Sequence, residues 1–138
     1  MKELQVILLT PEVKTVLSGV SHLILECPDG KRGILPGHAP AVIELAIGVL
    51  EARFQGGERE YYAISGGVAE ITPETVTILT ETCEKGNEID EFSTRRILEN
   101  IRKEIQEKRG DPETIHLEAR LLFSLAKLKA KELSQKRS

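Results

Sequence analysis

The distribution of glycine divides this 138-residue chain in two. Ten of its eleven glycines lie within residues 1–88, and only Gly110 lies beyond them. The charge divides at the same place: residues 1–88 carry a net charge of −6, and residues 89–138 carry +3. Because glycine weakens helices and favours turns, the first part suits short strands and the second suits helices. We therefore expect a β domain over residues 1–86 and a helical domain over residues 87–138.

The first part alternates apolar segments with turn residues. The turn signals include Pro28-Asp29-Gly30, Gly56-Gly57 and Gly66-Gly67. Segments with the apolar content or the alternation of strands cover residues 4–9, 22–26, 42–46, 49–54, 61–64, 68–71 and 76–80. Strands that recur about every eight to twelve residues predict an antiparallel sandwich or barrel.

The second part changes to a helical period, and its boundaries carry capping signals. Asp90 is a suitable N-cap for a first helix, and Gly110 follows two basic residues as a stop signal. Asp111 and Pro112 then restart a helix, with proline at its first position. The sequence therefore predicts an antiparallel hairpin with helices at about 90–108 and 112–134. Its apolar stripes are expected at Ile97, Leu98, Ile101 and Ile105 on the first helix, and at Leu117, Leu121, Leu125 and Leu128 on the second.

Composition excludes several classes of protein. A hydrophobic content of 40% with a net charge of −3 is unlike a disordered chain. No segment has the ~20 successive apolar residues of a membrane span, so no direct membrane insertion is expected, and no secretory signal is visible at the N-terminus. Cys27 and Cys83 are expected to be buried, inert thiols in a reducing cytoplasmic setting. No nucleic-acid partner is expected.

Catalytic signatures are missing from the sequence. His22, His38 and His116 stand far apart and lack companions at metal-ligand spacing. His38 lies in the segment 33–40 (GILPGHAP), whose two prolines and two glycines restrict the backbone. This segment is either a plain rigid loop or a surface that presents His38 to a partner at little ordering cost. A small enzyme that uses His38 is a further alternative, which the lack of a partner base or nucleophile near it in sequence disfavours.

Four segments together resemble one family. In chain order they are GILPGHAP at 33–40, ISGG at 64–67, VTIL at 76–79 and EID at 88–90. With their spacing, they resemble the epsilon subunit of F-type ATP synthase along essentially the whole chain. The resemblance implies a ten-stranded β-sandwich followed by the helical hairpin.

The resemblance also implies a role. The protein would be a non-catalytic subunit of the rotating central stalk, in contact with the gamma subunit and the ring of c subunits. It would help to couple proton-driven rotation to ATP synthesis. Its hairpin would inhibit ATP hydrolysis when extended along gamma toward the catalytic beta and alpha subunits. Its expected place is the cytoplasmic face of a bacterial cell membrane, as a peripheral part of the complex.

Interface residues are carried over by position. The resemblance places Asp29, Lys31 and Arg32 in the loop that meets the c ring, and Gly37 and His38 near the gamma and ring contacts. Some relatives carry an acidic residue where this chain has Lys31, so the charge pairing would differ here. Basic residues of the first helix would be attracted to an acidic loop of the catalytic beta subunit, and they are Arg95, Arg96, Arg102, Lys103, Lys108 and Arg109.

A nucleotide site is the point at which this chain departs from some relatives. Bacterial epsilon subunits that bind ATP carry Ile/Leu-Asp, two residues and Arg-Ala, whereas this chain has Ser93 and Thr94 in place of Arg-Ala. The remaining candidates for nucleotide contact are Ile89, Asp90, Arg95, Arg120 and Lys127. We therefore expect weak or absent ATP binding and no cofactor. An ATP-sensing module whose hairpin closes on nucleotide remains the alternative function.

Overall fold

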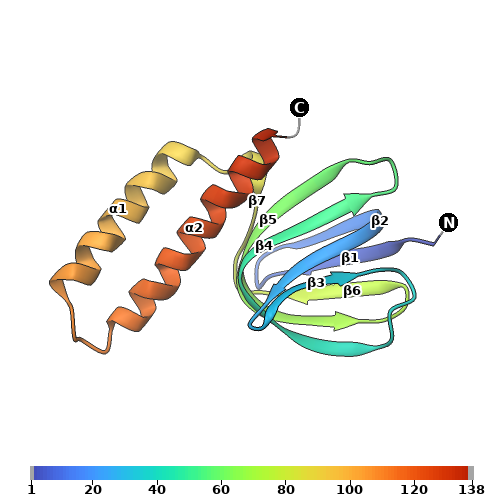
Figure 1. The fold of residues 1–138 in the computed structure, drawn as a ribbon, viewed down its shortest axis with the longest axis horizontal. Coiled ribbons are helices and arrows are strands. Elements are labelled where there is room, and N and C mark those ends of the chain that lie inside the picture. The colour runs from blue at the N-terminus through green and yellow to red at the C-terminus, as the bar shows by residue number, and fades with distance from the viewer. Residues whose placement is uncertain (1, 137–138) are drawn as a thin grey trace.

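Seven strands build the first part of the chain, as the computed structural model shows for the described residues 2–136 (Figure 1). They are β1 (Leu4–Leu9), β2 (Lys14–Cys27), β3 (Gly30–Ile34), β4 (Ala41–Phe54), β5 (Arg59–Ile71), β6 (Thr75–Leu79) and β7 (Cys83–Lys85). A 3₁₀ turn, η1 (Gly86–Glu88), leads to the helices α1 (Glu91–Glu107) and α2 (Thr114–Lys136). The predicted order of a β domain and then a two-helix hairpin is confirmed.

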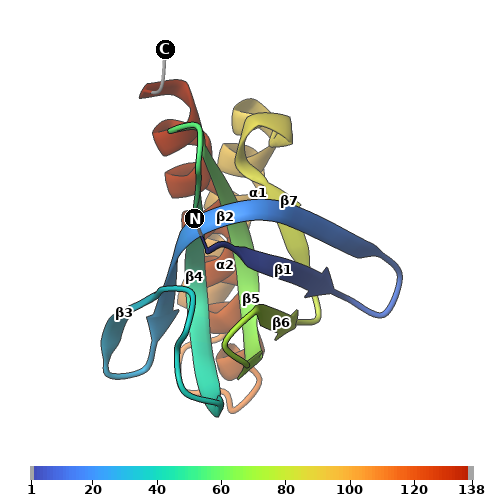
Figure 2. The ribbon, with the colours of Figure 1, turned by 90° about the vertical axis from the view of Figure 1, so that its right-hand side faces the viewer.

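The strands form one sheet that closes on itself. Its order is β1-β6-β5-β4-β2-β3, and β1 also pairs with β2, so that five strands make a closed ring. β3 extends the sheet from β2, and β7 pairs with β5. β1 and β6 are parallel, whereas the other pairs are antiparallel. Figure 2 shows β1 and β2 running across the direction of β4 and β5.

The ten strands that the resemblance implies are wrong for the described residues, which form seven. The sequence segments also differ from these strands, because long strands bend where the sequence suggests breaks. Gly48 lies within β4, and Gly66 and Gly67 lie within β5. The pairing of β4 with β5 keeps one register from Ala41↔Ile71 to Arg53↔Arg59, past all three glycines. Both Gly66 and Gly67 have positive φ, which lets β5 turn sharply while its ladder continues.

The interior of the closed sheet is the main hydrophobic core. Burial alternates along β1 and β6, as it does in strands with one buried face. Side chains from every part of the ring are fully buried there, and they include Val6, Leu23, Leu50, Ile64 and Ile78. Cys27 is buried beside this core, and both cysteines are free thiols.

The helix boundaries follow the capping signals closely. Asp90 is the N-cap of α1, because its Oδ1 accepts the backbone N–H of Phe92 at 3.0 Å and of Ser93 at 3.3 Å. Gly110 has φ +89 just after α1, as expected of a helix stop. The expected start of the second helix at Pro112 is wrong by two residues. The hydrogen bonds of that turn span three residues instead of four, for instance from Thr114 N–H to the Asp111 carbonyl, so the regular helix begins at Thr114.

The hairpin is folded against the β domain mainly through α2. α2 lies between α1 and the sheet and packs on β4, β5 and η1, whereas α1 packs mainly on α2 (Figure 1). The contact is a second apolar cluster made of Val49, Tyr61, Ala63, Ile89, Ala126 and Ala130, with Phe123 and Leu133 at its edge. Alanines on α2 allow a close approach of the helix to the strands.

Candidate partner interfaces

The β2–β3 turn presents the predicted ring-contact residues to solvent. Asp29, Lys31 and Arg32 are all exposed, and the Arg32 guanidinium lies 3.7 Å from the Asp29 carboxylate. Arg32 and Asp29 also line a recess of about 410 Å³ next to Val42, whose side chain is 71% exposed. Single exposed apolar side chains are common on protein surfaces, so this recess does not by itself mark an interface.

The segment around His38 forms a separate site. Asp29 lies in the β2–β3 turn and Lys31 and Arg32 lie in β3 itself, whereas Gly37 and His38 follow the other end of that strand. Within residues 2–136, no hydrogen bond or ion pair joins the two groups. They form two patches on the β domain.

The loop that holds His38 is fixed by its backbone. Gly37, at φ +88, donates its N–H to the Pro73 carbonyl at 2.8 Å, and His38 N–H bonds the Leu35 carbonyl at 3.2 Å. The His38 ring contacts the carbonyl of adjacent Ala39 through Nδ1 at 2.6 Å, and this is its only hydrogen bond to the described part of the chain. Since no side chain there orients the ring as a general base, the arrangement favours presentation to a partner over catalysis.

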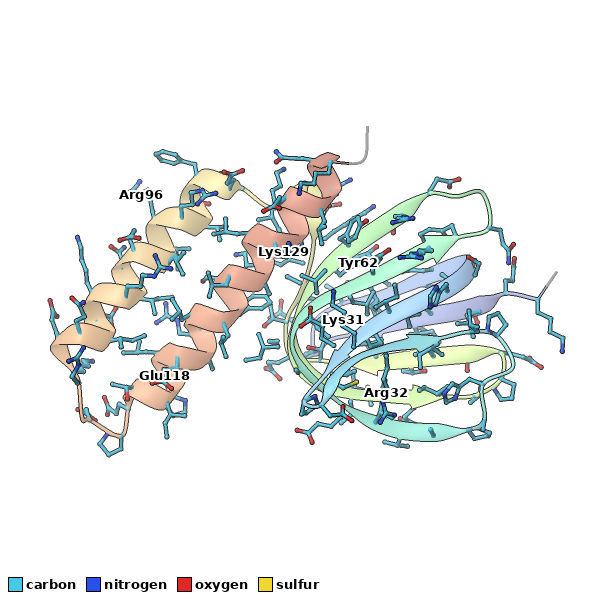
Figure 3. The ribbon with its side chains drawn as sticks, viewed as in Figure 1. Lys31, Arg32, Tyr62, Arg96, Glu118 and Lys129 are labelled. Carbon is cyan, nitrogen blue, oxygen red and sulfur yellow. The ribbon has the colours of Figure 1, made fainter. Side chains whose placement is uncertain are left out.

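The basic residues of α1 divide into two kinds. Arg95 and Arg102 are paired within the helix, at 3.0 Å from Glu91 and 3.2 Å from Glu99. The other four are exposed and form no ion pair with residues 2–136, and they are Arg96, Lys103, Lys108 and Arg109. Figure 3 shows Arg96 on the side of α1 away from α2. These four charges are available to an acidic partner.

Only two of the five residues predicted as candidates for nucleotide contact line the same recess. Arg120 and Lys127 line one recess of about 420 Å³ between α1, α2 and the sheet. Ile89 is buried in the cluster under α2, Asp90 caps α1, and Arg95 is paired with Glu91. None of these three lines that recess.

The recess is poorly equipped for a phosphate group. The Lys127 ammonium lies 3.2 Å from the Glu84 carboxylate and 5.8 Å from the centre of the Phe123 ring. Glu81 also lines the recess, together with the apolar side chains of Ile97 and Ile101. A triphosphate would have to compete with Glu84 for Lys127 and face the charge of Glu81.

Sequence reasoning missed the contact between η1 and α2. The Lys127–Glu84 ion pair joins α2 to β7, and Lys131 Nζ donates to the Asn87 carbonyl at 3.3 Å. Gly86 lies so close to α2 that an added Cβ would come within 2.5 Å of the Ala130 carbonyl oxygen. A glycine just before the helices and alanines on α2 were the available signals of this close approach.

Another recess, of about 540 Å³, lies beside β5 and β7 and is lined by four glutamates, Glu12, Glu60, Glu81 and Glu88, with Tyr62 and Cys83. Tyr62 donates its hydroxyl to Glu60 at 2.7 Å. Burial, and to a smaller extent this hydrogen bond, raises the pKa of Tyr62. Burial also raises the pKa of the Cys83 thiol to about 11. Neither group is an activated nucleophile, because both stay protonated at neutral pH.

Two further observations concern metals and membranes. Within residues 2–136, no three His, Cys, Asp or Glu side chains gather as the ligands of a metal ion. In the same part of the chain, neither helix has the length and apolar character needed to cross a bilayer.

Comparison with known proteins identifies the family. The family described as ATP synthase, Delta/Epsilon chain, beta-sandwich domain matches residues 3–86. This chain belongs to the ATP synthase delta/epsilon family.

Solved structures with the same architecture are parts of ATP synthases. A chain in the cryo-EM structure of the Euglena gracilis mitochondrial ATP synthase, described as OSCP/F1/c-ring, is 26% identical with a TM-score of 0.80. The match covers 98% of this chain and 82% of that chain. A chain in the central stalk/c-ring structure of the Tetrahymena thermophila mitochondrial ATP synthase shares the fold, with a TM-score of 0.58, 16% identity and coverage of 95% and 99%.

Proposed function

We propose that this protein is a non-catalytic central-stalk subunit of a proton-translocating F-type ATP synthase. The observation that carries the proposal is the extent of the similarity. The family match covers the β domain, and the likeness to the Euglena chain extends over 98% of the sequence and so includes the hairpin. That chain belongs to an assembly that contains F1 and a c ring. The role is to couple proton-driven rotation to ATP synthesis.

The partners follow from the two patches and the hairpin. The loop of Gly37 and His38 contacts the gamma subunit, and the turn of Asp29, Lys31 and Arg32 contacts the polar loops of the c ring. In this proposal the protein is a peripheral part of the complex at the cytoplasmic face of a bacterial cell membrane, where its partners hold it. The exposure of Asp29, Lys31 and Arg32 leaves this turn accessible to a partner, which supports the assignment.

The hairpin inhibits ATP hydrolysis when it leaves the β domain and extends along gamma toward the beta and alpha subunits. The exposed charges of Arg96, Lys103, Lys108 and Arg109 attract the acidic loop of beta in that state. The docked hairpin is the non-inhibiting state. Its contact with the β domain consists of one small apolar cluster and two polar links to β7 and η1, which suits an element that must be released.

Charge reversal tests the inhibitory role. ATP hydrolysis is measured on ATP synthase depleted of this subunit, with the wild-type or variant protein added back at low ionic strength. R96E/K103E should raise the half-inhibiting concentration by about tenfold or more, and added salt should weaken wild-type inhibition. The matched control, K2E/K14E, makes the same charge change on the β domain and should inhibit like the wild type. Equal inhibition by R96E/K103E would contradict the role of the basic face.

ATP sensing is the disfavoured alternative. Ser93 and Thr94 replace the Arg-Ala of ATP-binding relatives, and the Glu84 carboxylate already pairs with Lys127. Isothermal calorimetry of the isolated protein with ATP should therefore detect no micromolar binding. A micromolar dissociation constant would make nucleotide sensing the better account.

A further inference from the structure

One face of α2 remains apolar and open in the folded protein. Ile115, Leu122 and Leu125 are 67%, 52% and 40% exposed, although leucines in the middle of a helix hairpin are usually covered. Leu125 belongs to the apolar stripe that the sequence predicts for the second helix, yet it is exposed in the folded protein. Glu118 and Lys129 lie on the same open side of α2 (Figure 3). We call Ile115, Glu118, Leu122, Leu125, Lys129 and Glu132 the α2 stripe.

The position of the α2 stripe explains why the protein itself leaves it bare. Ala126 and Ala130 turn toward the sheet, and Leu117 and Ser124 are buried on another side of the helix. The stripe residues recur at steps of three and four, so they occupy one face between these two buried sides. Docking of the hairpin therefore cannot cover the stripe.

The stripe is self-complementary. Its spacing reads three, four, three, four, three, which is the same in both directions from a centre between residues 123 and 124. Two antiparallel copies of α2 related by a two-fold axis at this centre would place Leu122 against Leu125 of the second copy. The same axis would place Glu118 opposite Lys129, so two opposite-charge pairs would flank a central leucine cluster, whereas Ile115 would meet Glu132 at each end of the stripe.

The geometry points to a second copy of this chain as the occupant of the α2 stripe, and we propose an isologous, antiparallel dimer. In parallel pairing each charge would instead meet its own copy, so Glu118 would face Glu118 and Lys129 would face Lys129. The charge pattern therefore selects the antiparallel arrangement. This proposal is independent of the stalk function.

The dimer is expected to be weak. Leu122 and Leu125 of the two copies bury less than the ~1,000 Å² of a stable interface, so association should become visible only between about 0.1 and 1 mM. Lys129 already lies 4.0 Å from Glu132 in its own chain, but both groups are more than half exposed, and the exchange of partners costs little.

Charge-swap variants test the proposal. In sedimentation equilibrium, the wild type should rise from 15.3 kDa toward twice that mass as its concentration increases. E118K and K129E should each stay monomeric, because Lys would face Lys or Glu would face Glu. An equimolar mixture of the two should associate again, since both charge pairs are then restored. E118K/K129E should also associate. E107K, with the same charge change as E118K but on α1, should behave like the wild type.

Three results would overturn the proposal. The first is a wild type that remains at 15.3 kDa up to about 1 mM. The second is association of E118K and K129E alone that equals that of the wild type, which would assign the dimer to another surface. The third is a monomeric wild type whose capture by the gamma subunit is weakened by Leu122→Asp, which would make gamma the occupant of the stripe.

Discussion

Asp90, a candidate for nucleotide contact, is the N-cap of α1. Its carboxylate accepts two backbone N–H groups at the start of α1, and its carbonyl accepts the Thr94 hydroxyl at 2.7 Å. Thr94 is 2% exposed, so this first turn is anchored in the interface between the helices. The Ile-Asp pair of the nucleotide pattern is therefore accounted for by helix capping and burial.

Substitution of Asp90 separates capping from ligand binding. Asp90→Ala should lower the free energy of unfolding by about 1 kcal/mol, because two N–H groups lose their acceptor. Asp90→Asn keeps the acceptor oxygen and should lose much less. Urea denaturation followed by circular dichroism measures both, and equal losses in the two variants would show that the negative charge, and not the cap, supports α1.

The reactivity of the Cys83 thiol tests how deeply this residue is buried. The pKa of Cys83 is raised to about 11, mainly by burial and further by the charge of Glu84. At pH 8 the thiolate fraction should be about 100-fold lower than for a thiol at the reference value of 9.0. Reaction with a disulfide reagent should accelerate by about that factor on denaturation. A fast reaction of the folded protein at pH 8 would contradict this environment for Cys83.

At the scale of elements, the docking of α2 depends on a missing side chain. Gly86 faces the Ala130 carbonyl and the Ser134 hydroxyl, and a Cβ at this position would collide with both. The Ala130 carbonyl is main chain and cannot rotate away. The helix therefore approaches the strands as closely as it does only because residue 86 is glycine.

Gly86→Ala should therefore displace α2 from the β domain. The variant should show a larger radius of gyration by small-angle scattering and faster tryptic cleavage within the hairpin, while the β domain keeps its strand content. Ser134→Ala is the matched control, because it removes the side chain near Gly86 without adding bulk, and it should keep the hairpin docked. An unchanged scattering profile for Gly86→Ala would contradict the proposed contact.

The elements differed in how far sequence could predict them. Local signals at Asp90 and Gly110 define the ends of α1, and the helix pair was predicted to within about two residues. The strands were divided too finely at Gly48 and at Gly66-Gly67, because sequence does not distinguish a glycine that bends a paired strand from one that ends it. Long-range pairing across β4 and β5 decides between the two.

The site was less predictable than the fold because it depends on side chains brought together from distant segments. Lys127 was named as a nucleotide candidate, but its ion pair with Glu84 is visible only once α2 docks on β7. Arg32 was expected at the c ring and His38 near the gamma and ring contacts. In the structure Arg32 lies within β3 and His38 in the loop after it, where each has its own local partner.

For the whole molecule, the charge asymmetry corresponds to two structural parts. The acidic part is a closed sheet with two separate surface patches, and the basic part is a hairpin docked through one helix. The contact between them is one small apolar cluster with two polar links. A closed β domain with a separately docked hairpin is compatible with the proposed stalk function.

Capture by the gamma subunit of the same ATP synthase tests the central claim most directly. The full-length protein and gamma are mixed at micromolar concentration and separated by size-exclusion chromatography. The account predicts a stable complex with one copy of each, weakened by His38→Glu at the loop held by Gly37. Separate elution of the two proteins, even at tens of micromolar, would contradict the assignment of this chain to the central stalk.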